Sequence, residues 1–377
     1  MKIAGEWINH PGTQALCRVL EAAGHRALFV GGCVRNAVLG APVADIDLAT
    51  DALPETVSDL AEQAGFRVVP TGIAHGTVTV IAHGLPHEVT TFRRDVETDG
   101  RHAVVAFSTD VATDASRRDF TMNALYADRH GEVIDPLGGL PDLFARRVRF
   151  VGDAESRIRE DTLRILRFFR FHAWYGDPEG GIDAEGLAAC ASLIGGLETL
   201  SRERIGAEMV KLLSAPDPAP AIAIMAQAGV LAAILPGSDP RALAHLVHLE
   251  DGLAPRWQRR FAVLGGEADW RLSRAETVSN LRIRAAIGAS LTPAALGWTL
   301  GHDLATDALL ARAAVLETHL PPDWQTSIAR GAQATCPVKA ADLMSALQGP
   351  ALGQRLQQLQ DRWLASDLTA TRADLLA

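Results

Sequence analysis

The sequence lacks several features that would assign a chain to a structural class at once. Its four cysteines are scattered, at Cys17, Cys33, Cys190 and Cys336. They form no CxxC pair and no Cys/His cluster, which argues against a zinc site or a disulfide framework and predicts reduced thiols in a cytoplasmic protein. Residues 1–10 contain no apolar core of signal-peptide length. The least charged segment, residues 219–235, is too short and too rich in alanine to span a bilayer. We therefore predict a buried helical pair there and no membrane association.

Lysine is almost absent as well. Lys2, Lys211 and Lys339 are the only lysines among 36 basic residues, and the formal net charge is −9. A negative total disfavours a nucleic-acid partner, but phosphates respond to the local field. Residues 146–170 combine eight arginines with four acids, and residues 256–284 combine seven arginines with three acids. Because arginine is the general basic residue of this chain, the second stretch is compatible with an RNA contact and with a plain solvated helix face.

The pattern of elements changes near residue 140. A length of 377 residues suggests two to three structural units. Residues 1–24 are typical of an amphipathic helix, and another helix has Pro54 in its first turn and Gly65 just past its end. Strand signals occur at residues 27–30, 45–49, 76–82, 87–93 and 104–107. From Leu140 onward helical periodicity continues to the C-terminus, with proline breaks at residues 216–220 and 321–322. The sequence thus predicts a small α/β head and a long helical array.

One motif in the head carries chemistry. The apolar residues 27–30 enter Gly31-Gly32, a short helical segment follows, and then comes Asp45-Ile46-Asp47. Two carboxylates two residues apart on a strand point to the same face, and such a pair usually needs a cation. Glycine lets the backbone approach an anionic ligand. Carboxylates for a hard divalent ion beside a cradle for phosphates indicate phosphoryl or nucleotidyl transfer. The alternative is a glycine turn followed by a solvated carboxylate pair on an edge strand.

Two further motifs follow in order. Residues 117–125 read RRDFTMNAL, and residues 160–170 read EDTLRILRFFR. Together with GGxVR and DxD, they closely resemble class II tRNA nucleotidyltransferases, the CCA-adding enzymes, and their bacterial poly(A) polymerase relatives. The resemblance covers about residues 26–236. It implies a polymerase-beta-like α/β nucleotidyltransferase head with a mixed, mainly antiparallel sheet, followed by an all-α neck, body and tail. The corresponding ranges are 1–140 for the catalytic head, 141–215 for the neck with a base-reading helix, and 216–377 for the RNA-binding body and tail.

The resemblance also implies roles for residues of the first two motifs. Asp45 and Asp47 would be catalytic and hold two Mg²⁺ ions. Glu88 is a candidate third acid from a neighbouring strand, although a half-exposed strand glutamate is an ordinary feature. Gly32 and Arg35 match positions that contact the incoming nucleotide. The alternative for Arg35 is a surface salt bridge.

The neighbours of these residues bring two further expectations. Asn36 stands where the family usually has an aspartate, which questions any salt bridge that the carboxylate would make. Arg118 would bind the ribose or the phosphates, because arginine offers a rigid fork of donors. Arg117 could be a solvent-facing neighbour, Asp119 could orient the arginine pair, and Thr121 and Asn123 are interpreted as structural.

The last motif predicts base choice. Asp161, Arg164, Arg167 and Arg170 recur every three residues, so they are expected on one helical surface. Cytosine and adenine both present an exocyclic amino donor beside a ring-nitrogen acceptor, and an Asp acceptor beside an Arg donor complements both. Guanine and uracil present the reverse polarity. The resemblance points to the same Asp161–Arg164 pair and places Arg167 and Arg170 at nucleotide contacts. The alternative is an ordinary intrahelical ion pair.

The predicted function is template-independent addition of CCA to tRNA 3′ ends from CTP and ATP, with Mg²⁺ and release of pyrophosphate. The expected partners are tRNA, bound at its 3′ end and elbow, and the two nucleotides, with no obligatory protein partner. Residues 71–80, TGIAHGTVTV, resemble the stretch of CCA-type members more than the arginine-rich equivalent of poly(A) polymerases. The alternatives are a poly(A) polymerase, a partial CC- or A-adding enzyme, and a non-catalytic RNA-binding protein.

Overall fold

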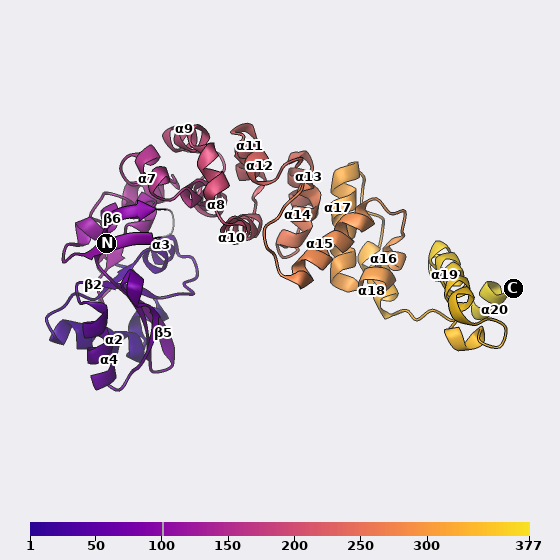
Figure 1. The fold of residues 1–377 in the computed structure, drawn as a ribbon, viewed down its shortest axis with the longest axis horizontal. Coiled ribbons are helices and arrows are strands. Elements are labelled where there is room, and N and C mark those ends of the chain that lie inside the picture. Colours follow the sequence, from indigo (N-terminus) through magenta and orange to yellow (C-terminus); the bar gives the residue numbers. More distant parts are fainter. Residues whose placement is uncertain (100–101) are drawn as a thin grey trace. The chain divides into compact units, whose positions relative to one another are not determined.

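The chain folds into two compact units, Met1–Leu200 and Ser201–Ala377. A computed structural model describes residues 1–99 and 102–377 (Figure 1). The first unit contains every strand of the described chain, and the second is built from helices. The division into head, neck, and body with tail is finer than these two units, and its boundaries stay a prediction.

The first unit is organised by a seven-stranded sheet of order β3-β4-β5-β2-β1-β8-β9. Its strands are β1 Leu28–Val30, β2 Asp47–Thr50, β3 Arg67–Gly72, β4 Thr77–Ala82, β5 Leu85–Thr91, β8 Tyr126–Ala127 and β9 Val133–Ile134. The pair β2–β5 is parallel and the other neighbours are antiparallel. Strands β6 Arg93–Asp99 and β7 His102–Phe107 form a separate two-stranded antiparallel sheet. The predicted mixed, mainly antiparallel sheet is confirmed.

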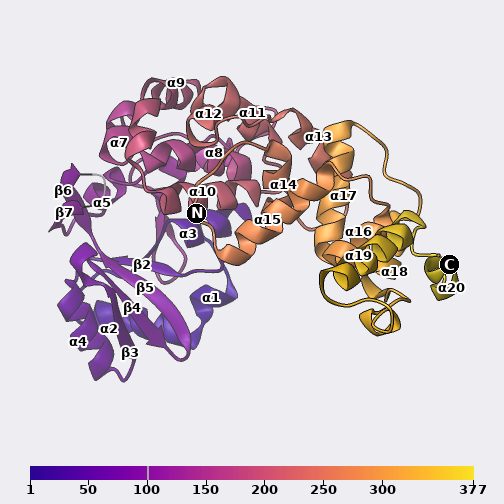
Figure 2. The ribbon, with the colours of Figure 1, turned by 45° about the vertical axis from the view of Figure 1, so that its right-hand side comes forward.

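The sheet has a buried side because its strands alternate. In β4, Val78, Val80 and Ala82 are fully buried while the alternate residues Thr77, Thr79 and Ile81 are half-buried, as the period of two requires. Helices α2 Pro11–Ala22 and α4 Pro54–Gln63 pack against β4 (Figure 2). The remaining helices of this unit are α1 Glu6–Asn9, α3 Gly32–Leu39, α5 Val111–Ser116, α6 Leu140–Phe144, α7 Ala154–Glu160, α8 Leu163–Tyr175 and α9 Ala184–Ser192.

Several sequence-based boundaries need correction. The predicted helix over residues 1–24 is two helices, because His10 precedes Pro11 and adopts φ −58° and ψ 132°, outside the helical region. Strands β3, β6, β8 and β9 were not predicted. The last two contain two residues each, which is too short for alternation to be recognised. The helix from Pro54, with Gly65 two residues past its last residue, is confirmed.

An aromatic cluster joins the head motifs to α8. The rings of Phe120 and Phe150 lie 5.0 Å apart, and Phe150 stacks on Phe168 at 5.3 Å with an interplanar angle of 18°. Phe171 lies 5.0 Å from Phe120. Phe120 belongs to RRDFTMNAL, and Phe168 and Phe171 lie on α8, which carries most of EDTLRILRFFR. This packing therefore holds the third and fourth motifs against each other.

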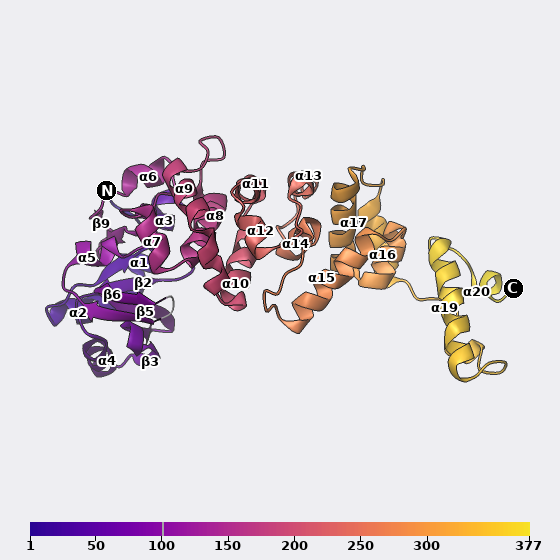
Figure 3. The same cartoon turned by 45° about the horizontal axis from the view of Figure 1, so that its top comes forward.

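The second unit is all-α, and residues 201–377 contain no strand (Figure 3). Its helices are α10 Arg202–Leu213, α11 Ala219–Gln227, α12 Val230–Ile234, α13 Arg241–Leu249, α14 Trp257–Leu264, α15 Arg274–Ile287, α16 Pro293–Leu300, α17 His302–Leu316, α18 Trp324–Gln333, α19 Gly349–Ala365 and α20 Arg372–Leu376. The predicted break at residues 216–220 covers the end of the α10–α11 connection and the first two residues of α11, and the break at 321–322 lies between α17 and α18. The predicted buried pair at residues 219–235 is α11 with α12. In the described part of the chain, no helix has the length and apolarity to cross a membrane.

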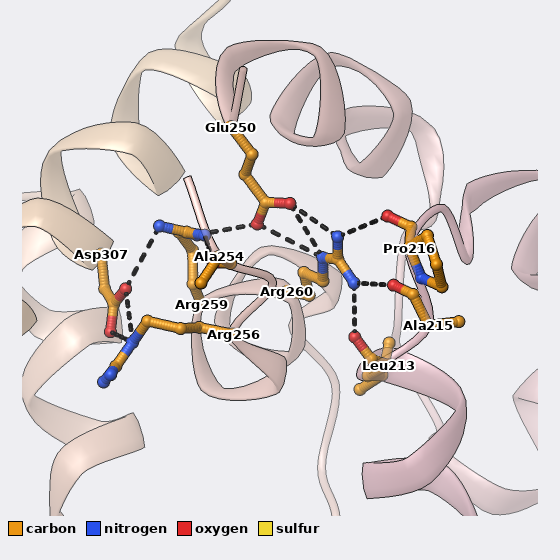
Figure 4. A network of polar contacts seen from close by, with 9 residues as sticks. All are labelled: Leu213, Ala215, Pro216, Glu250, Ala254, Arg256, Arg259, Arg260 and Asp307. Carbon is orange, nitrogen blue, oxygen red and sulfur yellow. Dashed lines mark hydrogen bonds and ion pairs between the residues drawn. The ribbon is translucent and has the colours of Figure 1, made fainter. Parts of the chain in front are cut away.

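The second basic stretch is partly buried, and both sequence-based interpretations fail for Arg259 and Arg260. Arg259 and Arg260 on α14 are each 1% exposed. Their guanidinium groups bind the carboxylate of Glu250, which is 5% exposed, at 2.8 Å and 2.7 Å (Figure 4). These two arginines therefore form neither a solvated face nor a surface for RNA.

The same network ties α14 to its neighbours. Arg260 also donates to the carbonyls of Leu213, Ala215 and Pro216, at and just after the end of α10. On the other side, Asp307 of α17 is fully buried and accepts from Arg256 at 3.0 Å. Residues of α10, α14 and α17, together with Glu250 just after α13, thus share one connected network of polar contacts (Figure 4). Isolated charges are costly to bury, so each member depends on the others.

Candidate active site

The glycine pair shapes the turn between β1 and α3. Gly31 has φ 70° and ψ −119°, a conformation that L side chains rarely adopt. A Cβ there would lie 3.4 Å from Nη1 of Arg118. The Gly31 N–H donates to the carbonyl of Leu125 at 3.0 Å, and its carbonyl accepts from the N–H of Arg35 at 2.9 Å. Gly31 therefore lies directly before α3, where its positive φ favours glycine, and the RRDFTMNAL motif packs beside it.

The carboxylates lie at the start of β2. Asp47 is the first residue of the strand and stands in register with Glu88 on β5. Asp45 precedes the strand and is exposed, so the prediction that both aspartates lie within one strand is wrong. The reason is that β2 pairs with its neighbours only from Asp47 onward. The structure nevertheless brings both aspartates to one cavity.

The acids repel one another. Burial raises the pKa of Asp47 to about 6, and Glu88 and Asp45 add to the rise, while Arg118 opposes it. Burial is the main cause of this shift, and the neighbouring like charges contribute to it; a bound cation would relieve both effects. Carboxylate oxygens are also the ligands that hard divalent cations take. The residues fit a divalent metal in these two respects. No group of three His, Cys, Asp or Glu side chains is already arranged as a metal site within the described residues, so the fit depends on the Asp45–Asp47 pair.

Arg35 shares the cavity with this pair. The cavity has a volume of about 230 Å³, and its lining includes Gly32, Arg35, Asn36, Asp45, Asp47 and Tyr175. The Arg35 side chain lies largely inside the protein, with the residue 6% exposed, so the predicted alternative of a surface salt bridge is wrong. Burial lowers the pKa of its guanidinium, while Tyr175 and Asp119 raise it.

A chain of polar contacts connects Arg35 to α8. Nη1 of Arg35 donates to Oδ1 of Asn123 at 2.6 Å, and Nδ2 of Asn123 donates to Oδ1 of Asp119 at 2.9 Å. The other oxygen of Asp119 accepts from Nε of Arg167 at 2.8 Å. Burial alone would raise the pKa of Asp119, but Arg167 and Asn123 outweigh it and hold the pKa below its usual range. Asp119 therefore orients Arg167 rather than Arg117 and Arg118.

The arginine pair of the third motif is held by a different acid. Asp114, which is 1% exposed, binds Arg117 at 2.8 Å and Arg118 at 3.0 Å. The hydroxyl of Tyr126 donates to Asp114 at 2.6 Å and accepts from Nε of Arg118 at 3.1 Å. Burial opposes the positive charge of Arg118, but Tyr126 and Asp114 outweigh it and raise its pKa. Arg117 pairs with Asp114 and is not the solvent-facing neighbour that the sequence suggested.

Three of the predicted nucleotide contacts surround one ring. The guanidinium carbons of Arg35, Arg167 and Arg170 lie 5.3, 5.4 and 4.5 Å from the centre of the Phe171 ring. Because Phe171 is 4% exposed, it is a fixed apolar platform for these cations. The first and fourth motifs thus meet at α8.

Arg164 lies in the first turn of α8, and Asp161 precedes this helix. Asp161 has an extended backbone between α7 and α8, so it does not share a helical surface with the three arginines as predicted. Its carboxylate accepts from the N–H of Leu163 at 3.1 Å. Arg164 is on α8, binds Glu160 at 2.6 Å, and donates to the carbonyls of Arg157 and Arg117. A guanidinium has five N–H groups, and these bonds of Arg164 do not use all of them.

Sequence reasoning missed the partners that hold the arginines. Tyr126 and Tyr175 are the two tyrosines of the chain, and both accept a hydrogen bond from a site arginine. Asp114 lies three and four residues before the arginine pair, and this helical spacing was a usable signal. No local signal marked Asn123 as a partner of Arg35, because 88 residues separate them.

Comparisons with known proteins point to one family. The model of the poly A polymerase head domain matches residues 27–149, and that of the probable RNA and SrmB-binding site of polymerase A matches residues 181–241. The human mitochondrial CCA tRNA nucleotidyltransferase 1 is 42% identical over 203 residues, 54% of this chain and 47% of that protein. The CCA-adding enzyme of Lacticaseibacillus paracasei is 32% identical over 381 aligned positions, 94% of this chain and 92% of that protein.

A solved structure has a similar fold. The crystal structure of the Bacillus stearothermophilus CCA-adding enzyme in complex with CTP superposes with a TM-score of 0.74 at 29% identity, covering 95% of this chain and 94% of that one. The chain spans about half the length of the first curated relatives that it matches, such as the human protein. The Lacticaseibacillus alignment, in contrast, extends over nearly all of both chains.

Proposed function

The chain belongs to the class II CCA-adding enzyme family, and we propose that it adds CCA to the 3′ end of tRNA from CTP and ATP without a template, releasing pyrophosphate. The observation that carries this proposal is the cavity at the Gly31–Gly32 turn. It presents two aspartates and a buried arginine to the same space. A phosphate chain needs this combination of a cation site and a fixed positive donor.

In this proposal Asp45 and Asp47 hold Mg²⁺. When bound, the metal would lower the pKa of the attacking 3′-hydroxyl and neutralise the triphosphate. The protein itself positions the phosphates of the nucleotide. The N-terminus of α3 faces the cavity through Gly32 and favours an anion there, because its first N–H groups carry partial positive charge. Arg35 adds a full charge, and Asn123 of RRDFTMNAL and Tyr175 at the end of α8 hold its side chain in place.

The other arginines are oriented before a ligand arrives. Asp114 and Tyr126 hold Arg118, and Asp119 holds Arg167. Preoriented donors lose less conformational freedom on binding, which favours tight and selective nucleotide contacts. Along α8, Arg164 and Tyr175 are about 16 Å apart, from the rise per residue of an α-helix. We propose that the nucleotide lies along this helix, with its phosphates near Tyr175 and its base near Arg164.

Base choice provides a prediction. Arg164→Ala should lower the use of both CTP and ATP, since both lose the same donor. Asp161→Ala should weaken the rejection of UTP and GTP by about tenfold to a hundredfold, because the wrong base would no longer leave buried polar groups unpaired. Single-turnover incorporation of all four nucleotides onto tRNA ending in C measures both effects.

The control for this experiment is Arg159→Ala, since the side chain of Arg159 on the preceding helix is 59% exposed. It should leave nucleotide preference unchanged. If Asp161→Ala and Arg164→Ala also left it unchanged, the bonds of Arg164 to Glu160, Arg157 and Arg117 would be its whole function.

Binding of tRNA provides another prediction. We propose that the helical region after Leu140 supplies most of the affinity through phosphate contacts, so affinity should fall steeply with added salt. Three arginines of the second basic stretch remain exposed, at Arg271, Arg274 and Arg282. Replacing all three by glutamine should lower the slope of log affinity against log salt by about two to three.

The matched control removes three exposed arginines from the head, at Arg18, Arg26 and Arg67. This variant should keep the slope of the unmodified protein. An equal decrease of this slope in both variants would mean that tRNA is not held mainly by the helical region.

A second candidate function is poly(A) polymerisation, which the match to the poly A polymerase head domain favours. The deciding experiment offers the protein tRNAs that end before CCA, after C and after CC, with one nucleotide at a time. Addition of CC from CTP and of one terminal A from ATP supports the proposal. Long adenosine tails would select the polymerase, and addition of only CC or only A would select a partial enzyme.

We also propose that the enzyme acts in the cytoplasm. The four cysteines are free and buried. Free thiols are the usual state in a reducing compartment, and this supports the proposal.

A further inference from the structure

The guanidinium of Arg35 is surrounded by neutral acceptors. Oδ1 of Asn36 accepts from its Nε at 3.1 Å and from its Nη2 at 2.9 Å. Asn123 accepts from Nη1 at 2.6 Å, and the hydroxyl of Tyr175 accepts from Nη2 at 2.7 Å. Within the described residues, the acid whose charge acts on Arg35 is Asp119, and that carboxylate already pairs with Arg167.

Asn36 satisfies two different groups at once. Its Oδ1 takes two N–H groups of Arg35, and its Nδ2 donates to the carbonyl of Pro42 at 2.8 Å. Pro42 belongs to the segment that leads to Asp45. An aspartate could accept from the guanidinium, but it could not donate to this carbonyl. The amide therefore connects Arg35 to the segment that carries one of the cavity's acids.

The charge of Arg35 is left without a counter-ion of its own. A buried cation is stable only when it is paired or well hydrogen-bonded, and neutral acceptors satisfy its N–H groups without cancelling its charge. Arg35 lines the cavity, so a ligand there meets the uncompensated charge directly. A carboxylate at position 36 would compete with an anionic ligand for the same guanidinium.

We propose that Asn36 is a positioning residue that holds Arg35 at the cavity without neutralising it, so that the triphosphate of the incoming nucleotide supplies the missing counter-charge. This inference rests on the proposed function for the identity of the ligand. The chemistry itself requires only a polyphosphate anion.

Two substitutions separate position from charge. Asn36→Asp keeps an acceptor for Arg35 and adds a negative charge, whereas Asn36→Ala removes the acceptor and adds none. Both lose the bond to Pro42. The binding of CTP, inorganic tripolyphosphate and cytidine is measured at equilibrium, without tRNA. Asn36→Asp should lower the affinity for CTP and for tripolyphosphate by an order of magnitude or more, because an ion pair of the introduced carboxylate with Arg35 would compete with the bonds of Arg35 to the phosphates. Asn36→Ala should lower these two affinities less, and cytidine should bind equally to all forms.

Asn9→Asp is the matched control, because Asn9 is exposed at the end of α1 and gives the same change in net charge. It should bind tripolyphosphate as the unmodified protein does. Thermal unfolding distinguishes this positioning role from a merely structural one, for which weaker binding would follow lower stability. Asn36→Asp should unfold at the same temperature as Asn36→Ala or higher, since it gains an ion pair, and yet bind triphosphate more weakly.

The inference is wrong if Asn36→Asp binds tripolyphosphate as tightly as the unmodified protein, or more tightly than Asn36→Ala. A failure of the proposed function gives a different result. The unmodified protein would then add no nucleotide to tRNA, while the order of tripolyphosphate affinities among the variants would still test Asn36.

Discussion

Asp45→Asn or Asp47→Asn should reduce nucleotide addition by at least about a thousandfold, because each variant loses a ligand of the proposed metal ions and several kcal/mol of charge stabilisation in the transition state. Binding of tRNA should stay within about twofold, since phosphate contacts are proposed for the helical region. Single-turnover CMP addition with Mg²⁺ and a filter-binding titration of tRNA measure the two effects. Asp59→Asn is the matched control, because Asp59 is exposed on α4.

The stability of these variants distinguishes loss of chemistry from loss of fold. The pKa of Asp47 is raised in the folded chain, so the folded state binds a proton more readily than the unfolded state. Above a pH of about 6 the ionised carboxylate therefore costs stability, and this cost is absent below the ordinary pKa of the group. At pH 8 without metal, Asp47→Asn should be at least as stable as the unmodified protein. Chelation of the metal should reproduce the loss of activity in the unmodified protein and add little to it in the variants.

Near-normal turnover of either variant with Mg²⁺ would contradict the assignment of the metal ligands. A variant that loses activity and also unfolds at a lower temperature would indicate a structural role for that carboxylate. The two outcomes are separable because turnover and unfolding are measured on the same preparation.

Glu250→Ala should destabilise the second unit by about 3–5 kcal/mol, because it leaves two buried arginines without their carboxylate. Glu250 binds both Arg259 and Arg260, and each of these arginines is 1% exposed. Urea unfolding, followed by tryptophan fluorescence, should show the loss. Trp257 and Trp270 belong to this unit, and Trp270 is 3% exposed and stacks on Phe261.

Glu267→Ala removes the same kind of side chain from an exposed position of this unit and should change stability by less than about 0.5 kcal/mol. Replacing Glu250 and Arg260 together by apolar residues should cost less than the sum of the single changes, because each single change strands the other charge. An unchanged urea midpoint for Glu250→Ala would show that the network in Figure 4 contributes little to stability.

The parts of this protein that sequence alone could predict are those that local chemistry determines. The glycine pair, the presence of a strand that contains Asp47, and the helix that begins at Pro54 each depend on a few consecutive residues. Glycine, proline and the periods of side chains act over one turn or one strand, so their effects are visible in the sequence. The change from strands to helices near residue 140 follows from the same periods.

The tertiary structure decided which side chains meet. Arg35 binds Asn123 and Tyr175, which are 88 and 140 residues away in the chain. Arg259 and Arg260 have the same local signature as solvated arginines, yet they are buried against Glu250 and the end of α10. No local pattern distinguishes a buried arginine from an exposed one, because its cost is offset by partners that only the folded chain brings within reach. The sequence alone thus identified the chemistry of the cavity, and the fold determined which neighbours hold that chemistry in place.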